Sequence, residues 1–224
     1  MTGATQLPGQ RGGPGVVEAV CVTHAVKRDP GIVGRTGIDK RPVDVVHVGT
    51  GGLTGDVVTD QVHHGGPDKA VYVYASEDAE WWSDQLGAEV PHGWFGENLR
   101  LRGVRAGGAV IGERWRVGEQ VLLEVTQPRI PCATFGRHVG QDRWVKRFSE
   151  AGRVGAYLRV LETGSVRAGD QVVVEHVPEH GVTVAGWFTG QDPEDARALL
   201  AAAALGLHLA PALVVFVERS LKRV

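Results

Sequence analysis

The chain has 224 residues, 42% of them hydrophobic, which is enough to bury the core of one large domain or of one domain with a small appendage. Its net charge of −2 excludes a global field that would draw it to nucleic acid or to a membrane surface. Only two cysteines occur, so we expect no disulfide framework and a reducing, cytoplasmic location. No stretch reaches the roughly 18 apolar residues of a membrane span, and the first 15 residues lack the apolar region of a secretory signal.

Glycine is frequent, with 32 residues, about twice the usual share of roughly 7%, which indicates many tight turns and short strands. Runs of β-forming residues predict strands over 16–26, 43–48, 57–62, 69–74, 97–101, 115–117, 121–126, 156–161 and 172–176. Helical spacing and end signals predict helices from Ser76, as N-cap, to just before Gly87, over 142–151, over 192–205 and from Pro211 onward. Trp81 and Trp82 on the first of these helices are interpreted as packing residues.

So many strands, interrupted by two short helices, predict a mainly β fold with a closed or nearly closed barrel. The composition changes at Pro178, where Ala- and Leu-rich helical segments replace strands. We therefore expect a disordered tail over 1–15, a β-barrel domain over 16–177 and a C-terminal helical extension over 178–224.

Cys132 follows a strand-like run and two prolines in the segment 127–135. Proline fixes its own φ and favours extended backbone in the residue before it, so the chain around Cys132 is held stiffly at a strand end. A thiolate is a nucleophile and a soft metal ligand, and nearby positive charge lowers the pKa of a cysteine. The segment fits a thiolate presented for chemistry, but it also fits a small buried hydrophobe, which is how we interpret Cys21.

Basic residues are dense after this cysteine. Seven Lys or Arg residues lie between Arg129 and Arg159, against Asp142 and Glu150, which is a local excess of five positive charges. A basic stretch near a thiolate suggests a small anionic ligand. A solvated basic helix face explains the same pattern.

The segment His63–Lys69 (HHGGPDK) is the second unusual cluster. Its two glycines and its proline predict a tight loop between two strands, whose backbone N–H groups can form an anion-binding nest beside Lys69. The adjacent histidines would point to opposite faces of extended backbone, so they are poorly placed to share one zinc ion. A hairpin turn with polar side chains is the simpler interpretation.

The segment Phe95–Leu99 (FGENL) is the third. A glycine lets the backbone approach a ligand closely, and Asn98 can both donate and accept hydrogen bonds, although a turn at the start of a strand gives the same pattern. The sequence holds no Walker motif, no strand–GxGxxG–helix unit and no GxSxG elbow. Flavin, nicotinamide and iron–sulfur sites are therefore not expected, the last because cysteines are too few.

Taken in chain order, these segments resemble the MOSC family, named after the C-terminal domain of molybdenum cofactor sulfurase. The resemblance rests on GLTGD at 52–56, HGGPDKAV at 64–71, FGENL at 95–99, IGERW at 111–115, QPRIPC at 127–132 and GRVGAYLRV at 152–160. It runs from about residue 16 to 177. The chain is most similar to the stand-alone bacterial branch with a short C-terminal three-helix extension, which residues 178–224 fit.

The resemblance implies a β-barrel and a pterin-based molybdenum cofactor. It places Cys132 at the cysteine that ligates molybdenum in cofactor-binding members, and Asn98 at an asparagine of the cofactor pocket in reductase members. The other residues expected to line this pocket or contact the pterin or its phosphate are Gly65, Gly66, Lys69, Arg129, Arg137 and Arg153. His64 or Asp68 is expected to supply a proton. Reductase members often show Arg-Pro-Asn where this chain has Gly96-Glu97-Asn98, so that arginine contact is not carried over.

Three functions follow from the resemblance. The first is an enzyme that reduces small N-hydroxylated compounds, such as hydroxylamines and N-hydroxylated bases, with electrons from a separate reductase. The second is a sulfur carrier with a persulfide on Cys132, and the third is a non-catalytic cofactor carrier. We favour the first, expect neither a nucleic-acid nor a membrane partner, and leave the oligomeric state open, a homodimer included.

Overall fold

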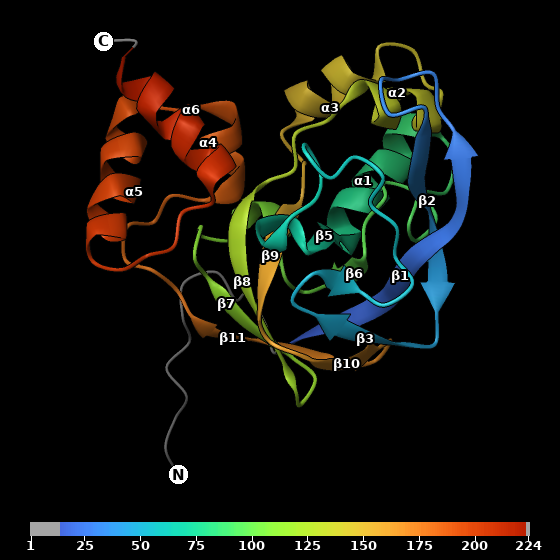
Figure 1. Cartoon of the computed structure of the whole chain (residues 1–224), viewed down its shortest axis with the longest axis horizontal. Helices are drawn as coiled ribbons and strands as arrows, with labels where there is room; N and C mark the ends of the chain where they lie inside the picture. The colour runs from blue at the N-terminus through green and yellow to red at the C-terminus, as the bar shows by residue number, and fades with distance from the viewer. Residues whose placement is uncertain (1–13, 223–224) are drawn as a thin grey trace.

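The structure is a computed structural model that describes residues 14–222. The expected N-terminal tail therefore lies almost entirely outside the described residues. Seven strands form a closed ring in which β11 pairs back onto β1 (Figure 1). In ring order they are β1 (Gly15–Arg28), β6 (Leu99–Arg102), β5 (Val71–Ala75), β9 (Ala156–Glu162), β8 (Val121–Pro128), β7 (Arg114–Val117) and β11 (Gln171–His176). This confirms the predicted mainly β, barrel-type fold.

Four further strands lie outside this ring. β2 (Arg35–Val43) pairs with β1 as an added edge strand. The short strands β3 (Val45–Gly49), β4 (Gly52–Leu53) and β10 (Gly164–Arg167) form a second sheet. The sequence did not predict β2, because Gly37, Pro42 and several charged residues break its pattern and only an edge strand tolerates such residues.

The strand predicted over 57–62 is wrong: the structure has bends and turns there. Side chains bind the backbone of this segment in place of a neighbouring strand. Thr23 Oγ1 accepts from the Val57 N–H at 3.0 Å, and the Asp60 carboxylate accepts from the His63 N–H at 3.0 Å. A 3₁₀ turn, η1 (Pro67–Lys69), then leads into β5.

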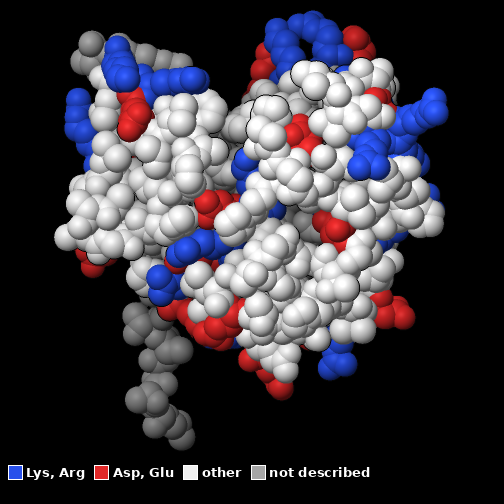
Figure 2. Space-filling model, viewed as in Figure 1, with Lys and Arg blue, Asp and Glu red and all other residues white. Residues whose placement is uncertain are grey.

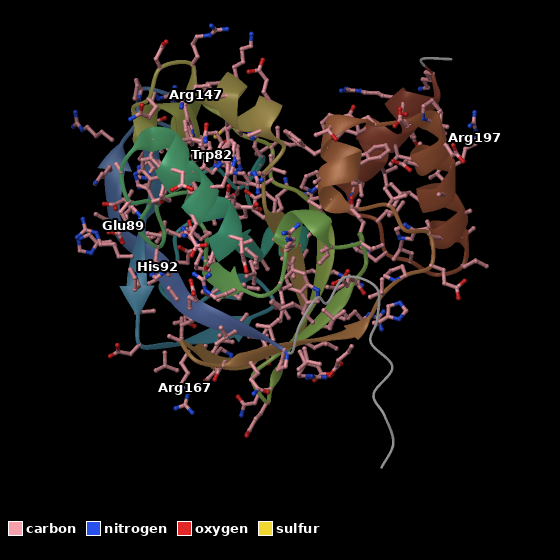
Figure 3. The ribbon with its side chains drawn as sticks, turned by 180° about the vertical axis from the view of Figure 1, so that it is seen from behind. Trp82, Glu89, His92, Arg147, Arg167 and Arg197 are labelled. Atoms are coloured by element: carbon pink, nitrogen blue, oxygen red, sulfur yellow. The ribbon has the colours of Figure 1, made fainter. Side chains whose placement is uncertain are left out.

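Three helices cover one end of the barrel: α1 (Ser76–Leu86), α2 (Ala133–Val139) and α3 (Trp144–Ala151). They enclose an aromatic cluster in which Trp82 of α1 meets Trp144 and Phe148 of α3, with ring centroids 4.6 and 5.6 Å apart (Figure 3). Gly87 ends α1 in the left-handed conformation, as predicted. Ser76 is not the N-cap; Ala75 holds that position, and the Ser76 hydroxyl donates to Glu18.

Three C-terminal helices stand beside β7 and β8: α4 (Val184–Thr189), α5 (Pro193–Ala204) and α6 (Pro211–Leu221) (Figure 1). Thr183 caps α4 by accepting from the Gly186 N–H. Trp187, Leu199 and Leu213 are buried in the same apolar cluster as the barrel residues, and each such side chain contributes about 1.5–3 kcal/mol when buried. The extension is therefore packed onto the barrel through a shared core. A turn, η2 (Ala106–Gly108), also contacts α4.

Membrane-spanning helices are not found among residues 14–222, because every helix there is too short or too polar to cross a bilayer.

Candidate functional site

The chain turns at Cys132 from the end of β8 into α2. β8 is buried along its whole length, and Pro131 precedes an extended Cys132 with φ −124° and ψ 171°. The Cys132 carbonyl accepts the Gly136 N–H at 3.0 Å, which starts α2. The thiol is free and half-buried, whereas Cys21 is free and fully buried. Burial raises the pKa of Cys21 to about 12, so only Cys132 is presented for chemistry.

Arg129 is a buried cation beside this cysteine. It is 4% exposed, and its guanidinium lies 4.0 Å from the ring centroid of Phe135 on α2 and 5.6 Å from that of Tyr72. Its Nη1 is buried and has no hydrogen-bond partner within residues 14–222. A buried charged donor without an acceptor is costly, so it marks a place where an anionic or oxygen-bearing ligand fits.

His64 and Tyr157 form a polar pair near Arg129. The His64 Nδ1 lies 3.3 Å from the Tyr157 hydroxyl oxygen. Burial, and then the positive charge of Arg129, lower the pKa of His64 to about 4, so the ring is neutral at neutral pH. Burial raises the pKa of Tyr157, which the positive charge of Arg129 opposes, and Cys132 packs against the cluster that holds Tyr157. Cys132, Arg129, His64 and Tyr157 therefore belong to one site.

The two glycines of the His63–Lys69 loop are needed for its backbone conformation. A Cβ on Gly65 would lie 2.8 Å from the Gln61 Cα, and Gly66 has φ 92°, where a side chain is strained. Lys69 Nζ donates to the His63 carbonyl at 2.6 Å, which braces the loop. His63 faces Asp60 and His64 faces Tyr157; both histidines lie in a turn and not on the extended backbone that was expected.

Asp68 points toward the C-terminal extension. Its carboxylate lies 2.7 Å from His208 Nε2, in the loop between α5 and α6, and its carbonyl accepts from the Thr126 hydroxyl at 2.6 Å. The extension is thereby tied to the loop that carries His64. The structure thus places His64, one candidate proton donor, beside Tyr157. It places Asp68, the other candidate, against the C-terminal extension.

Arg137 lies on α2, one turn beyond Cys132, and forms a two-bond pair with Asp29 of the β1–β2 turn. The distances are 2.8 Å from Nε and 2.6 Å from Nη2. The Arg137 guanidinium holds the pKa of Asp29 down at about 2. This pair fastens the β1–β2 turn to the helix that follows Cys132.

Two predicted contacts of the cofactor face other parts of the protein. Arg153 pairs with Asp78 of α1 and lies over the Trp81 ring, with 4.8 Å to its centroid. Asn98 is 3% exposed; its amide nitrogen donates to Asp56 and to the Cys21 carbonyl, and its oxygen accepts the Tyr72 N–H. Both amide hydrogens of Asn98 are thus already engaged in the barrel wall.

Two residues near the site, Tyr157 and His208, were not predicted from the sequence. Tyr157 stands in the strand segment 152–160, where its alternation with apolar residues gave only a strand signal. His208 lies in the loop between two predicted helices. Neither pairing could be predicted from a local motif, because Tyr157 is 93 residues from His64 and His208 is 140 residues from Asp68.

A hollow separates the C-terminal helices from the part of the molecule formed by α2 and α3 (Figure 2). A narrow cleft of about 20 Å³ lies where the extension meets the segment before Cys132. Its lining includes Pro128, Ile130, Phe188, Gln191 and Phe216. Within the described part of the chain, no group of three or more His, Cys, Asp or Glu residues could hold a metal ion. A metal at this site would therefore need donors from a bound cofactor in addition to Cys132.

Comparisons with known proteins agree with this architecture. The protein-family model described as the MOSC domain matches residues 60–173. The protein YflK of Bacillus subtilis is 37% identical over 150 residues, which are 66% of this chain and 67% of YflK. The crystal structure of YiiM from Geobacillus stearothermophilus superimposes with a TM-score of 0.72 at 27% identity, over 92% of this chain and 100% of that one.

A protein named reductase from Gibberella moniliformis is 34% identical over 112 residues. The match covers 49% of this chain but only 20% of that much longer protein. The family model spans half of the chain, and YflK matches along two thirds of its own length. The chain belongs to the MOSC domain family.

Proposed function

We propose that this protein binds a molybdenum cofactor beside Cys132 and reduces small N-hydroxylated compounds there. The observation that carries the proposal is the unpartnered, buried Nη1 of Arg129, within residues 14–222, next to a half-buried free thiol. A soft thiolate suits molybdenum, and a guanidinium suits the phosphate or the anionic pterin group of such a cofactor. The donor set present therefore fits the group, and the MOSC family is associated with it.

Cys132 would hold the metal and Arg129 the anionic part of the cofactor. When bound, the cofactor supplies two-electron redox chemistry. The overall reaction converts a hydroxylamine, two electrons and two protons into an amine and one water, and the electrons come from a separate reductase. The chain's own residues bind and orient the cofactor and handle the protons.

The His64–Tyr157 pair is the proton-handling group in this proposal. His64 is neutral at neutral pH because burial and Arg129 lower its pKa to about 4. A neutral imidazole can accept a proton from the Tyr157 hydroxyl at Nδ1 or donate one to it, depending on its tautomer. The 3.3 Å contact is therefore a short relay between the solvent-facing loop and the buried Tyr157.

The first experiment measures molybdenum and pterin in protein purified from a host that makes the cofactor. Wild type is compared with Cys132→Ala and, as matched control, with Cys21→Ala, which removes the buried thiol. We expect near-stoichiometric molybdenum in wild type and in Cys21→Ala, and little in Cys132→Ala. Reduction of a hydroxylamine by chemically reduced dye should follow the molybdenum content. Cofactor and activity retained in Cys132→Ala would contradict the proposal, and cofactor without turnover would indicate a carrier.

A sulfur carrier is the second candidate, favoured by the partial exposure of the free Cys132 thiol. A cysteine desulfurase would transfer a sulfur atom from its own persulfide to the Cys132 thiolate. Mass spectrometry after incubation with a desulfurase and cysteine should then show one added sulfur atom on Cys132 and none on Cys21. An unmodified Cys132 would remove this candidate.

A further inference from the structure

One surface beside the candidate site is strongly basic although the chain as a whole is slightly acidic. The β1–β2 hairpin end (27–41) and the α2–α3 segment (137–150) together hold nine Lys or Arg against four Asp or Glu. Asp29 and Thr134 join the two segments at 3.1 Å, and Arg137 pairs with the same carboxylate. Figure 2 shows Lys and Arg gathered over this upper right part of the molecule, where Figure 1 places α2 and α3. We call it the basic face.

Four arginines of the basic face form no ion pair within residues 14–222. They are Arg28, Arg35, Arg143 and Arg147. The salt bridges of the two segments involve Lys27, Lys40, Arg41, Arg137 and Lys146 instead, and Lys40 is turned inward to Asp56. Arg28 and Arg35 are directly opposite each other across the hairpin, and like charges in that position destabilise a strand pair. The fold thus keeps a repulsive arrangement that a single acidic substitution would relieve.

The basic face also carries exposed apolar side chains at the tip of the hairpin. Ile32 is fully exposed and Val33 is 43% exposed, both in the turn between Arg28 and Arg35. Apolar side chains together with charged ones are typical of a protein–protein interface. Nucleic-acid backbones offer little for such apolar side chains, and a membrane-surface element would need a longer apolar face on a helix.

The basic face adjoins Cys132. α2 begins directly after this residue, and Arg137 lies on that same short helix. A protein docked on the hairpin end and α2 would therefore sit next to the proposed metal ligand. Electron-transfer complexes are typically small and transient, which suits a face of two short segments.

We propose that the basic face docks the electron donor, and that this donor is a small redox protein with an acidic surface. The inference rests on the proposed function, since only a reductase needs such a partner. Opposite charges would steer the donor to this end of the barrel and speed association. The complex would weaken as salt rises, because the Debye length falls to about 3 Å at 1 M salt.

The test compares two charge-reversal pairs that change net charge equally. Arg28→Glu with Arg143→Glu alters the basic face, and Arg167→Glu with Arg197→Glu alters distant arginines, which Figure 3 labels on β10 and α5. The first pair should fold at least as well as wild type, because the carboxylate introduced by Arg28→Glu would face Arg35 and form an opposite-charge pair. Turnover of a hydroxylamine is driven either by a reduced acidic flavodoxin or ferredoxin, or by a reduced small dye.

We expect the first pair to lower kcat/KM for the acidic carrier about tenfold or more, with dye-driven turnover unchanged and the salt dependence reduced. The distant pair should behave like wild type. Three results would overturn the docking proposal but not the proposed function. They are an equal loss of kcat/KM in both variant pairs, carrier-driven turnover that depends neither on the substitutions nor on salt, and no turnover with any acidic carrier. Binding of anionic vesicles or duplex DNA by the face, with carrier turnover unaffected, would also overturn it. Failure of dye-driven turnover in wild type would remove the proposed function, and the docking proposal with it.

Discussion

Two buried arginines in this protein show how differently the same side chain can be used. Arg100 is 2% exposed, donates through Nε to Glu97 at 2.9 Å, reaches the Pro91 carbonyl and lies 5.7 Å from the Tyr74 ring centroid. Arg129 is 4% exposed and equally close to Tyr72, but no carboxylate pairs with it in the described residues and its Nη1 is orphaned. Arg100 completes the barrel wall, whereas one guanidinium nitrogen of Arg129 is left without an acceptor. The absence of a carboxylate partner, more than burial itself, makes Arg129 the candidate for binding a ligand.

The largest expected effect is the loss of stability on replacing Arg100, the arginine that is paired within the barrel wall. Arg100→Met leaves Glu97 as an uncompensated buried carboxylate and should destabilise the protein by about 3–5 kcal/mol. Arg129→Met removes a charge that no carboxylate pairs, so its free energy of unfolding should stay within about 1 kcal/mol of wild type or rise, since only the cation–π contacts and a contact with Tyr157 are lost. Urea unfolding of both variants without cofactor measures this. An equally large loss of unfolding free energy in Arg129→Met would show that the charge of Arg129 is compensated within the protein.

Asn98 gives a second contrast with Arg129. It was expected in the cofactor pocket, yet its amide joins Asp56, Cys21 and Tyr72 inside the wall. Asn98→Ala should therefore cost about 1–3 kcal/mol of stability, because buried polar groups lose partners. Molybdenum bound per folded molecule should not change, in contrast to Arg129→Met, where it should fall. Loss of cofactor with full stability in Asn98→Ala would instead support the expectation from the sequence that this residue contacts the cofactor.

Much of the fold was predictable because local signals agreed with tertiary structure. The apolar run at 121–126 became the fully buried β8, and the helix ending at Gly87 stopped there in the left-handed conformation. The missed elements lack such signals. α2 has seven residues with Thr134 and Gly136 among them, both poor helix formers, and is held by packing of Phe135 and Val139.

The candidate site was predictable where its residues follow one another in the chain. Cys132 and Arg129 stand in one proline-rich segment, and His64 stands in a glycine-rich loop. Tyr157 is brought to the site by the pairing of β8 with β9, in which Gln127 lies opposite Tyr157. The register between two distant strands cannot be predicted from either strand alone. The chain's motif FGENL is largely structural here: Glu97 accepts from the backbone of Gly93 and Phe95 and from Arg100.

The charge of Arg129 should also be visible in the pH dependence of stability. The pKa of His64 is about 4 in the folded protein, below its ordinary value of 6.5. The unfolded chain then binds a proton more readily, so stability falls as pH drops from about 6.5 to about 4 and levels off below. Arg129→Met should raise the His64 pKa and shrink this loss, and His64→Gln should abolish its share. NMR titration of the His64 ring in wild type and Arg129→Met measures the shift; an unchanged pKa would mean that burial alone sets it.

The smallest expected effect concerns a cation that is neither buried nor orphaned. Lys146 lies 3.5 Å from Glu150 one turn along α3, and both side chains are more than half exposed. Such a pair contributes about 0.3–0.5 kcal/mol, so Lys146→Ala should shift the urea midpoint barely, and high salt should erase the difference from wild type. A loss above about 1 kcal/mol would show that this face is held together by its charges. A negligible loss would show that this exposed ion pair, unlike the buried pair of Arg100 with Glu97, contributes little to folding. Exposed charges on the basic face can then be reversed without unfolding the protein, and a changed response to an acidic electron carrier would reflect docking.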